Sequence, residues 1–256
     1  MRFRDRRLIS LLLVALASAA ALALSACGDD DSGGGSNRGL PQGSEPANLD
    51  PADFTTDIDN PYWPMKPGSR WVYRETDSEG AGQRVVVTVT RRTKLIANGV
   101  TARVVHDVVT EDGKPVEVTE DWYAQDRAGN IWYLGEDTTE YENGKPVSKK
   151  GSFEAGLDGA EPGVIMPAHP RVGMRYRQEY YKGHAEDRAR IFSLRERVEV
   201  PFGFFRQTLM TREENPLEPR VLEYKFYARG VGPVLAVSVS GGSDREELVR
   251  FRRGRR

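Results

Sequence analysis

The chain has 256 residues, of which 38% are hydrophobic and 29% are charged. This length and composition fit one large or two small globular domains, and they exclude a disordered, collagen-like or multi-span membrane protein. The 37 basic and 38 acidic side chains leave a net charge of −1, which gives no electrostatic reason to expect a nucleic-acid partner. The single cysteine excludes an internal disulfide framework and a cysteine-based structural zinc site.

The N-terminus has the pattern of a bacterial lipoprotein signal peptide. Four arginines among the first seven residues precede a long apolar run. Leu24-Ser25-Ala26-Cys27 then resembles the lipobox, which implies cleavage before Cys27 and acylation of its thiol. We therefore expect residues 1–26 to be a signal peptide, with Leu24, Ser25 and Ala26 recognised for cleavage. An uncleaved N-terminal helix is the alternative, and both interpretations leave the rest of the chain outside the cytoplasmic membrane.

The segment after the lipobox is predicted to be a flexible tether. Residues 27–46 are rich in Gly, Ser and Asp and contain only one aliphatic side chain, so they cannot bury enough surface to offset the entropy of ordering. Their glycine and aspartate runs lack the features of a phosphate loop or a calcium loop. Residues 47–60 form a lead-in, and residues 61–256 form the body of the protein. The expected location is extracytoplasmic, with the membrane as first partner through acyl chains on Cys27.

The body shows the two-residue periodicity of β-strands. Six segments alternate polar residues with β-branched and aromatic ones, and they are residues 85–90, 101–109, 116–123, 191–200, 221–227 and 234–239. Asn-Gly, Asp-Gly and Gly-Gly pairs between such segments predict tight hairpins. No segment of ten residues has a convincing amphipathic helical pattern. We predict an all-β protein, an antiparallel meander that forms a curved sheet, a sandwich or a partly open barrel.

The body also matches itself at an offset of 104 to 105 residues. Gly68-Ser69-Arg70-Trp71 aligns with Gly173-Met174-Arg175-Tyr176, and Trp122-Tyr123-Ala124 aligns with Phe226-Tyr227-Ala228. Arg91 aligns with Arg195, and Gly99 with Gly203. Because these anchors occur in the same order, we predict that residues 61–157 and 164–250 are repeated halves.

Three motifs resemble those of an uncharacterised family of β-rich cell-envelope lipoproteins. Residues 64–73, PMKPGSRWVY, are similar to that family's P-x-K-x-G-x-x-W-x-Y pattern. Residues 198–205, VEVPFGFF, resemble its V-x-V-P-x-G-x-F strand, and residues 227–234, YARGVGPV, its Y-A-x-G-V-G-x-V hairpin. The sequence of residues 135–144 also resembles the same region in members of an unnamed bacterial lipoprotein family. The resemblance implies an antiparallel β-meander in the envelope, and it implies no catalytic residues.

No motif of nucleophilic, phosphate-binding or metal-dependent catalysis is present in the sequence. Two weak metal candidates are His184 with Glu186 and Asp187, and the oxygen-rich residues 57–60. Adjacent charges on loops are more often solvated, so we predict neither a metal site, nor a cofactor, nor a catalytic residue.

Two further groups have both a structural and a functional interpretation. Glu136, Asp137, Glu140 and Glu142 include enough carboxylates for a glycosidase, although an exposed acidic hairpin is the favoured interpretation. The aromatic residues Tyr62, Trp63 and Trp132 lie near turns and could line a ligand groove, whereas packing in the core is the commoner role.

The sequence therefore favours a membrane-anchored, non-enzymatic lipoprotein with a β-rich binding domain. Its partner is an unidentified envelope protein, lipid or glycan. One alternative is a carrier of lipids or other hydrophobic ligands, which needs an uncovered apolar face. The other alternative is a cell-wall glycan hydrolase that uses the carboxylates of residues 136–142.

Overall fold

The computed structural model describes residues 39–76, 80 and 82–254. Cys27 and the lipobox residues 24–26 lie outside this part of the chain, as does the apolar run before them. No helix within the described residues is long and apolar enough to cross a membrane.

The described chain is built almost entirely of β-strands. Its one helical turn is a short 3₁₀ helix, η1 (Pro51–Asp53). The strands are β1 (Phe54–Thr55), β2 (Arg70–Thr76), β3 (Gly82–Leu95), β4 (Thr101–Glu111), β5 (Lys114–Asp126), β6 (Ile131–Glu142), β7 (Lys145–Ser148), β8 (Phe153–Glu154), β9 (Glu161–Met166), β10 (Arg175–Arg177), β11 (Glu179–Tyr180), β12 (Arg188–Val200), β13 (Gly203–Glu214), β14 (Leu222–Ala228), β15 (Gly232–Ser240) and β16 (Arg245–Arg252). All six predicted strands are confirmed.

Tight turns join consecutive strands where the sequence predicts them. At the β4–β5 turn Asp112 and Gly113 have φ angles of 50° and 77°, and at the β6–β7 turn Asn143 and Gly144 have 51° and 75°. Two successive positive φ values give the turn a twist that matches a two-stranded ribbon. The neighbouring strands consequently pair antiparallel, as in every ladder of the described chain.

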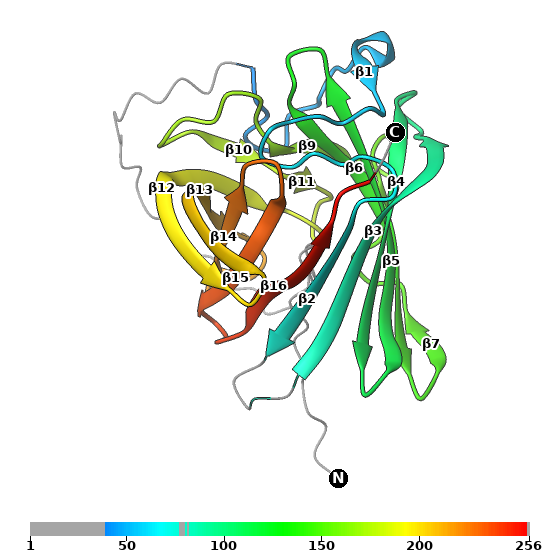
Figure 1. The fold of residues 1–256 in the computed structure, drawn as a ribbon. Helices are drawn as coiled ribbons and strands as arrows, with labels where there is room; N and C mark the ends of the chain where they lie inside the picture. Colours follow the sequence, from blue (N-terminus) through cyan, green and yellow to red (C-terminus); the bar gives the residue numbers. More distant parts are fainter. Residues whose placement is uncertain (1–38, 77–79, 81, 255–256) are drawn as a thin grey trace.

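The sheet curls into a nearly closed barrel with one unsealed seam (Figure 1). Its strand order is β10-β12-β13-β14-β15-β16-β2-β3-β4-β5-β6-β9-β11, with β1, β7 and β8 attached to the sides. The two end strands, β10 and β11, follow each other in the chain but pair with opposite ends of the sheet. Arg177 on β10 pairs with Arg188 on β12, whereas Glu179 on β11 pairs with Pro162 on β9. One short segment therefore forms both edges of the seam. The predicted all-β antiparallel class is confirmed, in its barrel form.

The seam is fastened by the N-terminal end of the described chain. The buried Arg177 guanidinium donates hydrogen bonds to the carbonyls of Gly43, Glu45 and Pro162, and the Arg177 backbone N–H donates to Pro41. Burial itself lowers the pKa of Arg177, while the charge of Glu45 opposes this shift. These contacts attach the last residues of the predicted tether to the barrel.

The two runs of consecutive strands follow the same order. The aligned anchors place Trp71 on β2 and Tyr176 on β10, and Tyr123 on β5 and Tyr227 on β14. By the same alignment β2 to β6 correspond to β10 and β12 to β15, each run being a continuous antiparallel meander. The superposition of residues 61–157 on 164–250 stays a prediction.

The apolar core occupies one part of the barrel interior. The Trp63 ring packs between Tyr123 and Tyr227, with ring centroids 5.7 and 6.0 Å apart. On β2 the inward residues Trp71 and Tyr73 are almost fully buried, and the Trp71 indole donates a hydrogen bond to the carbonyl of Val231. Aromatic side chains from both meanders therefore meet in one cluster.

Candidate functional site: the acidic interior of the barrel

Strand alternation directs several carboxylates into the barrel. On β4, Val105, Asp107 and Val109 share one face and are all buried. On β5, Asp121 and Tyr123 share a face in the same way, and both are fully buried. These acidic side chains stand in phase with core residues, because side chains two positions apart point to the same side of a strand.

The result is an interior acidic cluster, to which β4, β5, β6, β11, β16 and the segment before β12 contribute. Asp107 on β4 pairs with Val87, which pairs with Trp71 on β2, and Glu246 on β16 pairs with Glu75 on β2. Both acids therefore lie on the same side of the sheet as the buried residues Trp71 and Glu75. We define the interior acidic cluster as the six buried carboxyl groups that form no ion pair with Lys225 and whose pKa is raised mainly by burial: Asp107, Asp121, Glu136, Glu179, Asp187 and Glu246.

Two of these carboxyl groups share a tyrosine. Asp121 and Glu136 are direct partners across β5 and β6, and the Tyr133 hydroxyl lies 3.0 Å from Asp121 Oδ1 and 2.6 Å from Glu136 Oε2. A phenol has one proton, so only one of the two contacts can be donated by Tyr133. The other requires a protonated carboxyl group. Burial raises the pKa of both acids, and a nearby carboxylate raises it further, Glu136 for Asp121 and Glu117 for Glu136, which is consistent with this arrangement.

Two other acids are poised near neutrality. Burial raises the pKa of Asp107 to about 7, and burial raises the pKa of Asp187 to about 8 against the opposing charge of Lys225. Both groups therefore exchange protons in the range where most proteins hold ionised carboxylates.

The second meander carries the buried cation. Lys225 Nζ lies 2.9 Å from Glu213 Oε2 and 3.2 Å from Glu223 Oε2, and the Lys225 side chain is 3% exposed. Burial alone would lower its pKa, but the two carboxylates raise it well above the usual value. Lys225 is thus held as an ammonium ion, and its charge is already matched by Glu213 and Glu223.

Several polar atoms of the interior lack a hydrogen-bond partner. They include both carboxyl oxygens of Glu246, Oδ2 of Asp121 and the hydroxyl of Tyr123. The Tyr123 hydroxyl is directed toward the cluster, since Asp121 and Glu136 are the charges that most raise its pKa after burial. Buried polar groups are nearly always paired in native proteins, so these atoms mark the place where a further molecule would bind.

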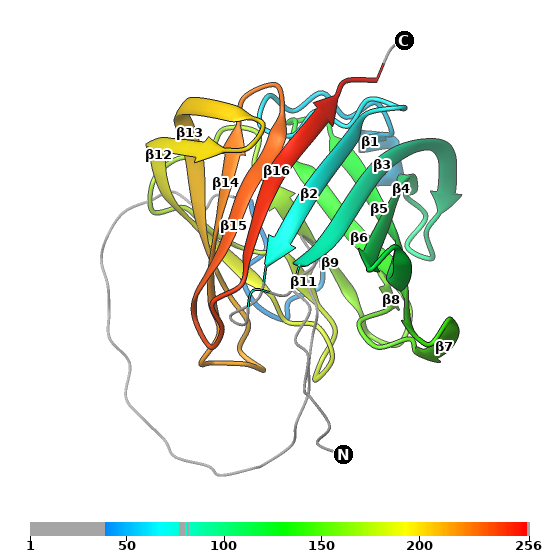
Figure 2. The same ribbon diagram turned by 60° about the horizontal axis from the view of Figure 1, so that its bottom comes forward.

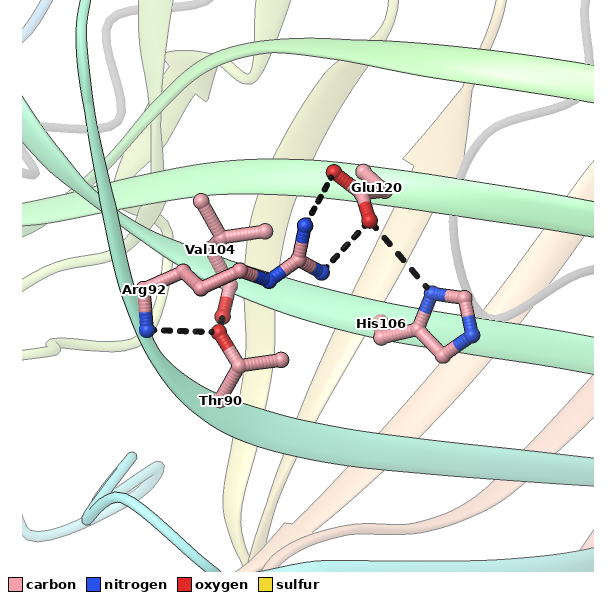
Figure 3. A network of polar contacts seen from close by, with 5 residues as sticks. All are labelled: Thr90, Arg92, Val104, His106 and Glu120. Carbon is pink, nitrogen blue, oxygen red and sulfur yellow. Dashed lines mark hydrogen bonds and ion pairs between the residues drawn. The ribbon is translucent and has the colours of Figure 1, made fainter.

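The outer face of the same strands is different (Figure 3). Glu120, the neighbour of Asp121, accepts two hydrogen bonds from the Arg92 guanidinium, at 2.5 and 3.1 Å. His106, the neighbour of Asp107, has its Nδ1 3.8 Å from Glu120 Oε1. The side chains of these three residues are between one third and just over one half exposed. Adjacent residues of a strand point to opposite faces, so these ion pairs lie in solvent although their neighbours in sequence belong to the interior acidic cluster.

The aromatic residues predicted as a weak groove lie in the core. Tyr62, Trp63 and Trp132 are each less than a tenth exposed. Trp132 packs edge-on against Phe54, and its indole N–H donates to Asp126 Oδ2 at 2.8 Å. All three therefore pack within the described core, and a role in ligand binding stays a prediction.

The weak metal candidates do not converge. His184 is exposed and stacks on Tyr181, and Glu186 accepts a hydrogen bond from the Gly183 N–H, whereas Asp187 is buried. Asp59 accepts a hydrogen bond from the Gln125 side chain. Among the described residues no three acidic, His or Cys side chains are grouped so that they could hold a metal ion.

The prediction of an exposed acidic hairpin at residues 136–142 was wrong for its first residue. Glu136 is 3% exposed, whereas Asp137 lies on the outer face and forms an ion pair with Lys149. β6 is not a free edge, since β5 pairs with one side of it and β7, β8 and β9 with the other. Alternation along β6 provided no cue, because the register shifts between Tyr133 and Glu136, and this bulge turns Glu136 to the same side as Tyr133.

Comparisons with known proteins identify no family. No family model and no curated protein matches the chain. Among solved structures, a "putative lipoprotein" from Parabacteroides distasonis ATCC 8503 is 14% identical, covering 75% of this chain and 98% of its own, with a TM-score of 0.41. A β-barrel-like protein of a domain of unknown function, DUF1849, from Brucella abortus is 12% identical, covering 72% and 96%, with a TM-score of 0.34. Similarities at these scores assign no function.

Proposed function

We propose that this protein is a non-enzymatic envelope lipoprotein, anchored through acylated Cys27, whose barrel binds a small amine-bearing ligand in its interior. The observation that supports the ligand class is the interior acidic cluster, where six buried carboxyl groups form no ion pair with a cation of the described residues. An ammonium or guanidinium group supplies both the positive charge and the N–H donors that such acids accept.

The size of the barrel supports an interior ligand. A barrel of about eight strands is just wide enough for its own side chains, and wider barrels enclose cavities. The path of this sheet runs through thirteen strands. The carboxyl groups also come from separate strands and do not gather around one point, which favours an extended organic cation over a single metal ion.

The two alternatives from the sequence fit this interior less well. A carrier of hydrophobic molecules needs an apolar cavity, and carboxyl groups at Asp107 and Glu246 would be desolvated without compensation by a lipid tail. A hydrolase would need a close carboxyl pair, and two such pairs are Asp121 with Glu136, which share the Tyr133 hydroxyl, and Glu179 with Asp187, which hydrogen-bond to each other. The experiment below keeps this activity as an outcome.

Native mass spectrometry of the protein purified from its own host tests the ligand class. We expect a retained small molecule that contains an amine or a guanidine. Calorimetry with spermidine as a probe at pH 7 should show binding with proton release, because a bound cation lowers the pKa of nearby acids. A retained lipid or neutral glycan, or spermidine binding without proton release, would contradict the proposal.

A matched pair of variants separates interior binding from surface attraction. Asp121→Asn with Glu136→Gln replaces two interior carboxyl groups, and Glu120→Gln with Asp137→Asn removes the adjacent charges on the outer face. The interior double variant should lose ligand and probe binding, and the outer one should keep both. Hydrolysis of envelope glycans by the wild type that only the interior variant loses would replace the binding role with an enzymatic one.

The anchor has its own test. Cys27→Ser removes the only thiol that could be acylated, so we expect an unprocessed precursor without the mass of the acyl chains. An identical mature mass and detergent partitioning in variant and wild type would contradict the lipoprotein assignment while leaving the ligand proposal intact.

A further inference from the structure

The turn between β12 and β13 carries large exposed aromatic side chains. Phe202 and Phe204 are 40% and 52% exposed. Phe205, the next residue on β13, points to the opposite side of the strand and packs against the core. Aromatic side chains of this exposure on a protruding turn are typical of an interaction surface.

Three arginines lie on the side of the hairpin that carries the Phe204 ring. Arg195, Arg197 and Arg206 line one surface hollow together with Gln207. Within the described part of the chain, no carboxylate lies within ion-pair distance of any of the three. The Arg206 guanidinium carbon lies 5.3 Å from the centroid of the Phe204 ring. The hollow therefore presents unpaired positive charge next to apolar surface.

The backbone of this hairpin is shaped to bring the arginines together. The pairing of β12 with β13 shifts register on both sides of Glu196, so that Glu196 pairs with Thr208 and Arg197 pairs with Arg206. Gln207 is left over, with a φ of 56° that is uncommon outside glycine. Such bulges bend a strand and redirect its side chains.

The turn is fixed against the last strand of the barrel (Figure 2). The Phe202 N–H donates to the Leu248 carbonyl at 3.0 Å, and the Phe202 ring packs edge-on against Phe251. This contact joins the turn to β16 next to the exposed residues Val249 and Arg250. We call the exposed surface of the hairpin the hairpin patch, defined by Arg195, Arg197, Phe202, Phe204 and Arg206.

We propose that the hairpin patch docks on an anionic phospholipid surface. The lipid phosphates match the arginine hollow in charge, and Arg binds phosphate oxygens in a bidentate geometry. Phe202 and Phe204 supply the apolar side chains that enter the headgroup region, as in other interfacial contacts. An acidic soluble protein would satisfy the arginines but would leave these two rings without an apolar environment. The docking is independent of the ligand bound in the barrel.

Hydrogen–deuterium exchange of the full chain in lipid vesicles tests this surface. The N-terminal anchor holds the protein equally in phosphatidylcholine and phosphatidylglycerol vesicles, so a difference between them reports the headgroup. We expect slower exchange in residues 195–206 only with phosphatidylglycerol. Each of the single variants Arg195→Gln, Arg197→Gln and Arg206→Gln should raise the phosphatidylglycerol fraction needed for half-maximal protection by roughly fivefold or more. The triple variant should lose the protection completely.

The control uses the corresponding hairpin of the first meander. Arg91 aligns with Arg195, and Leu95 on the same strand is 69% exposed. Arg91→Gln with Leu95→Ser should leave protection unchanged, and Phe202→Ser with Phe204→Ser should abolish it while exchange elsewhere stays as in the wild type. Equal protection in both lipids, protection by inorganic phosphate alone, or a triple arginine variant that behaves as wild type would overturn the proposal.

Discussion

Strands β5 and β14, which the sequence alignment matches, differ in the charge that they carry inside the barrel. Two residues before the matched tyrosine, β5 carries Asp121 and β14 carries Lys225. Around Lys225 the buried acids Glu213 and Glu223 form ion pairs at 2.9 and 3.2 Å. Around Asp121 there is another acid, Glu136, and a shared tyrosine hydroxyl.

This difference shows how one side chain decides the state of a buried polar group. A buried carboxylate stays ionised when a cation is within contact distance, and otherwise it takes up a proton. The second meander therefore has a compensated charge cluster that stabilises the fold. The first meander has acids that are neutral or close to titration, and these can respond to a ligand.

The largest expected effect follows from removing the buried cation. Lys225→Met should lower the free energy of unfolding by about 3–5 kcal/mol, because it leaves two buried carboxylates without their partner. Urea denaturation followed by tryptophan fluorescence measures this loss. Arg74→Met is the control, since Arg74 pairs with Glu247 at 2.9 Å but is 55% exposed, and its loss should be at most about 1 kcal/mol. Equal losses in the two variants would remove the distinction between the meanders.

The pH dependence of stability is the second test. Raised pKa values mean that the folded state retains protons that the unfolded chain releases, so stability is greatest at low pH and falls as pH rises. The fall should extend to about pH 7 for Asp107 and to about pH 8 for Asp187. Each such group contributes about 1.4 kcal/mol per pH unit between its unfolded and folded pKa.

Asp107→Asn isolates one of these groups. Urea unfolding at pH 5, 6 and 7 should show a slope that is shallower by about 1.4 kcal/mol per unit than in the wild type. Asp137→Asn on the outer face should leave the slope unchanged. A wild-type protein that gains stability between pH 5 and pH 8 would show that the cluster is not held in the protonated form.

A smaller effect on stability is expected from removing the hydroxyl of Tyr133 or of Tyr227. Tyr133→Phe removes the hydroxyl shared by Asp121 and Glu136 and should cost about 1–3 kcal/mol, since it leaves buried carboxyl oxygens unsatisfied. Tyr227→Phe removes a hydroxyl whose contact with Glu213 Oε1 is 3.5 Å long, so its cost should be below about 1 kcal/mol. Denaturant midpoints compare the two, and a larger loss for Tyr227 would reverse this order.

The smallest effect is expected on the outer face. Glu120→Gln breaks the contact with Arg92, which is 56% exposed, and should change stability by no more than about 1 kcal/mol. A double-mutant cycle with Arg92→Gln measures the coupling directly. A coupling as large as the loss in Lys225→Met would mean that burial does not govern the strength of these pairs.

The sequence could predict much of the fold because its signals are local. Alternation of β-branched residues with polar ones identifies the strands, and the Asn-Gly and Asp-Gly pairs identify the turns. Aligned anchors such as Tyr123 and Tyr227 also predict that the two meanders correspond, which stays a prediction. The candidate site could be predicted only in part. Asp107 stands in phase with the core residues Val105 and Val109, but alternation alone cannot tell a filled core from a polar interior, and a bulge in β6 sets the face of Glu136.

The sequence by itself determined the strand pattern, the hairpins and the absence of known catalytic motifs, since each depends on residues close together in the chain. The lipobox at Cys27 stays a prediction. Tertiary structure decided how the sheet closes, because β10 and β11 become opposite edges only when the whole barrel has formed. It also decided that acids from β4, β5, β6 and β16 are buried together, and that within the described residues Lys225 lies in ion-pair contact with Glu213 and Glu223. Burial and long-range proximity set these pKa values, and neither is encoded in the local pattern of a strand.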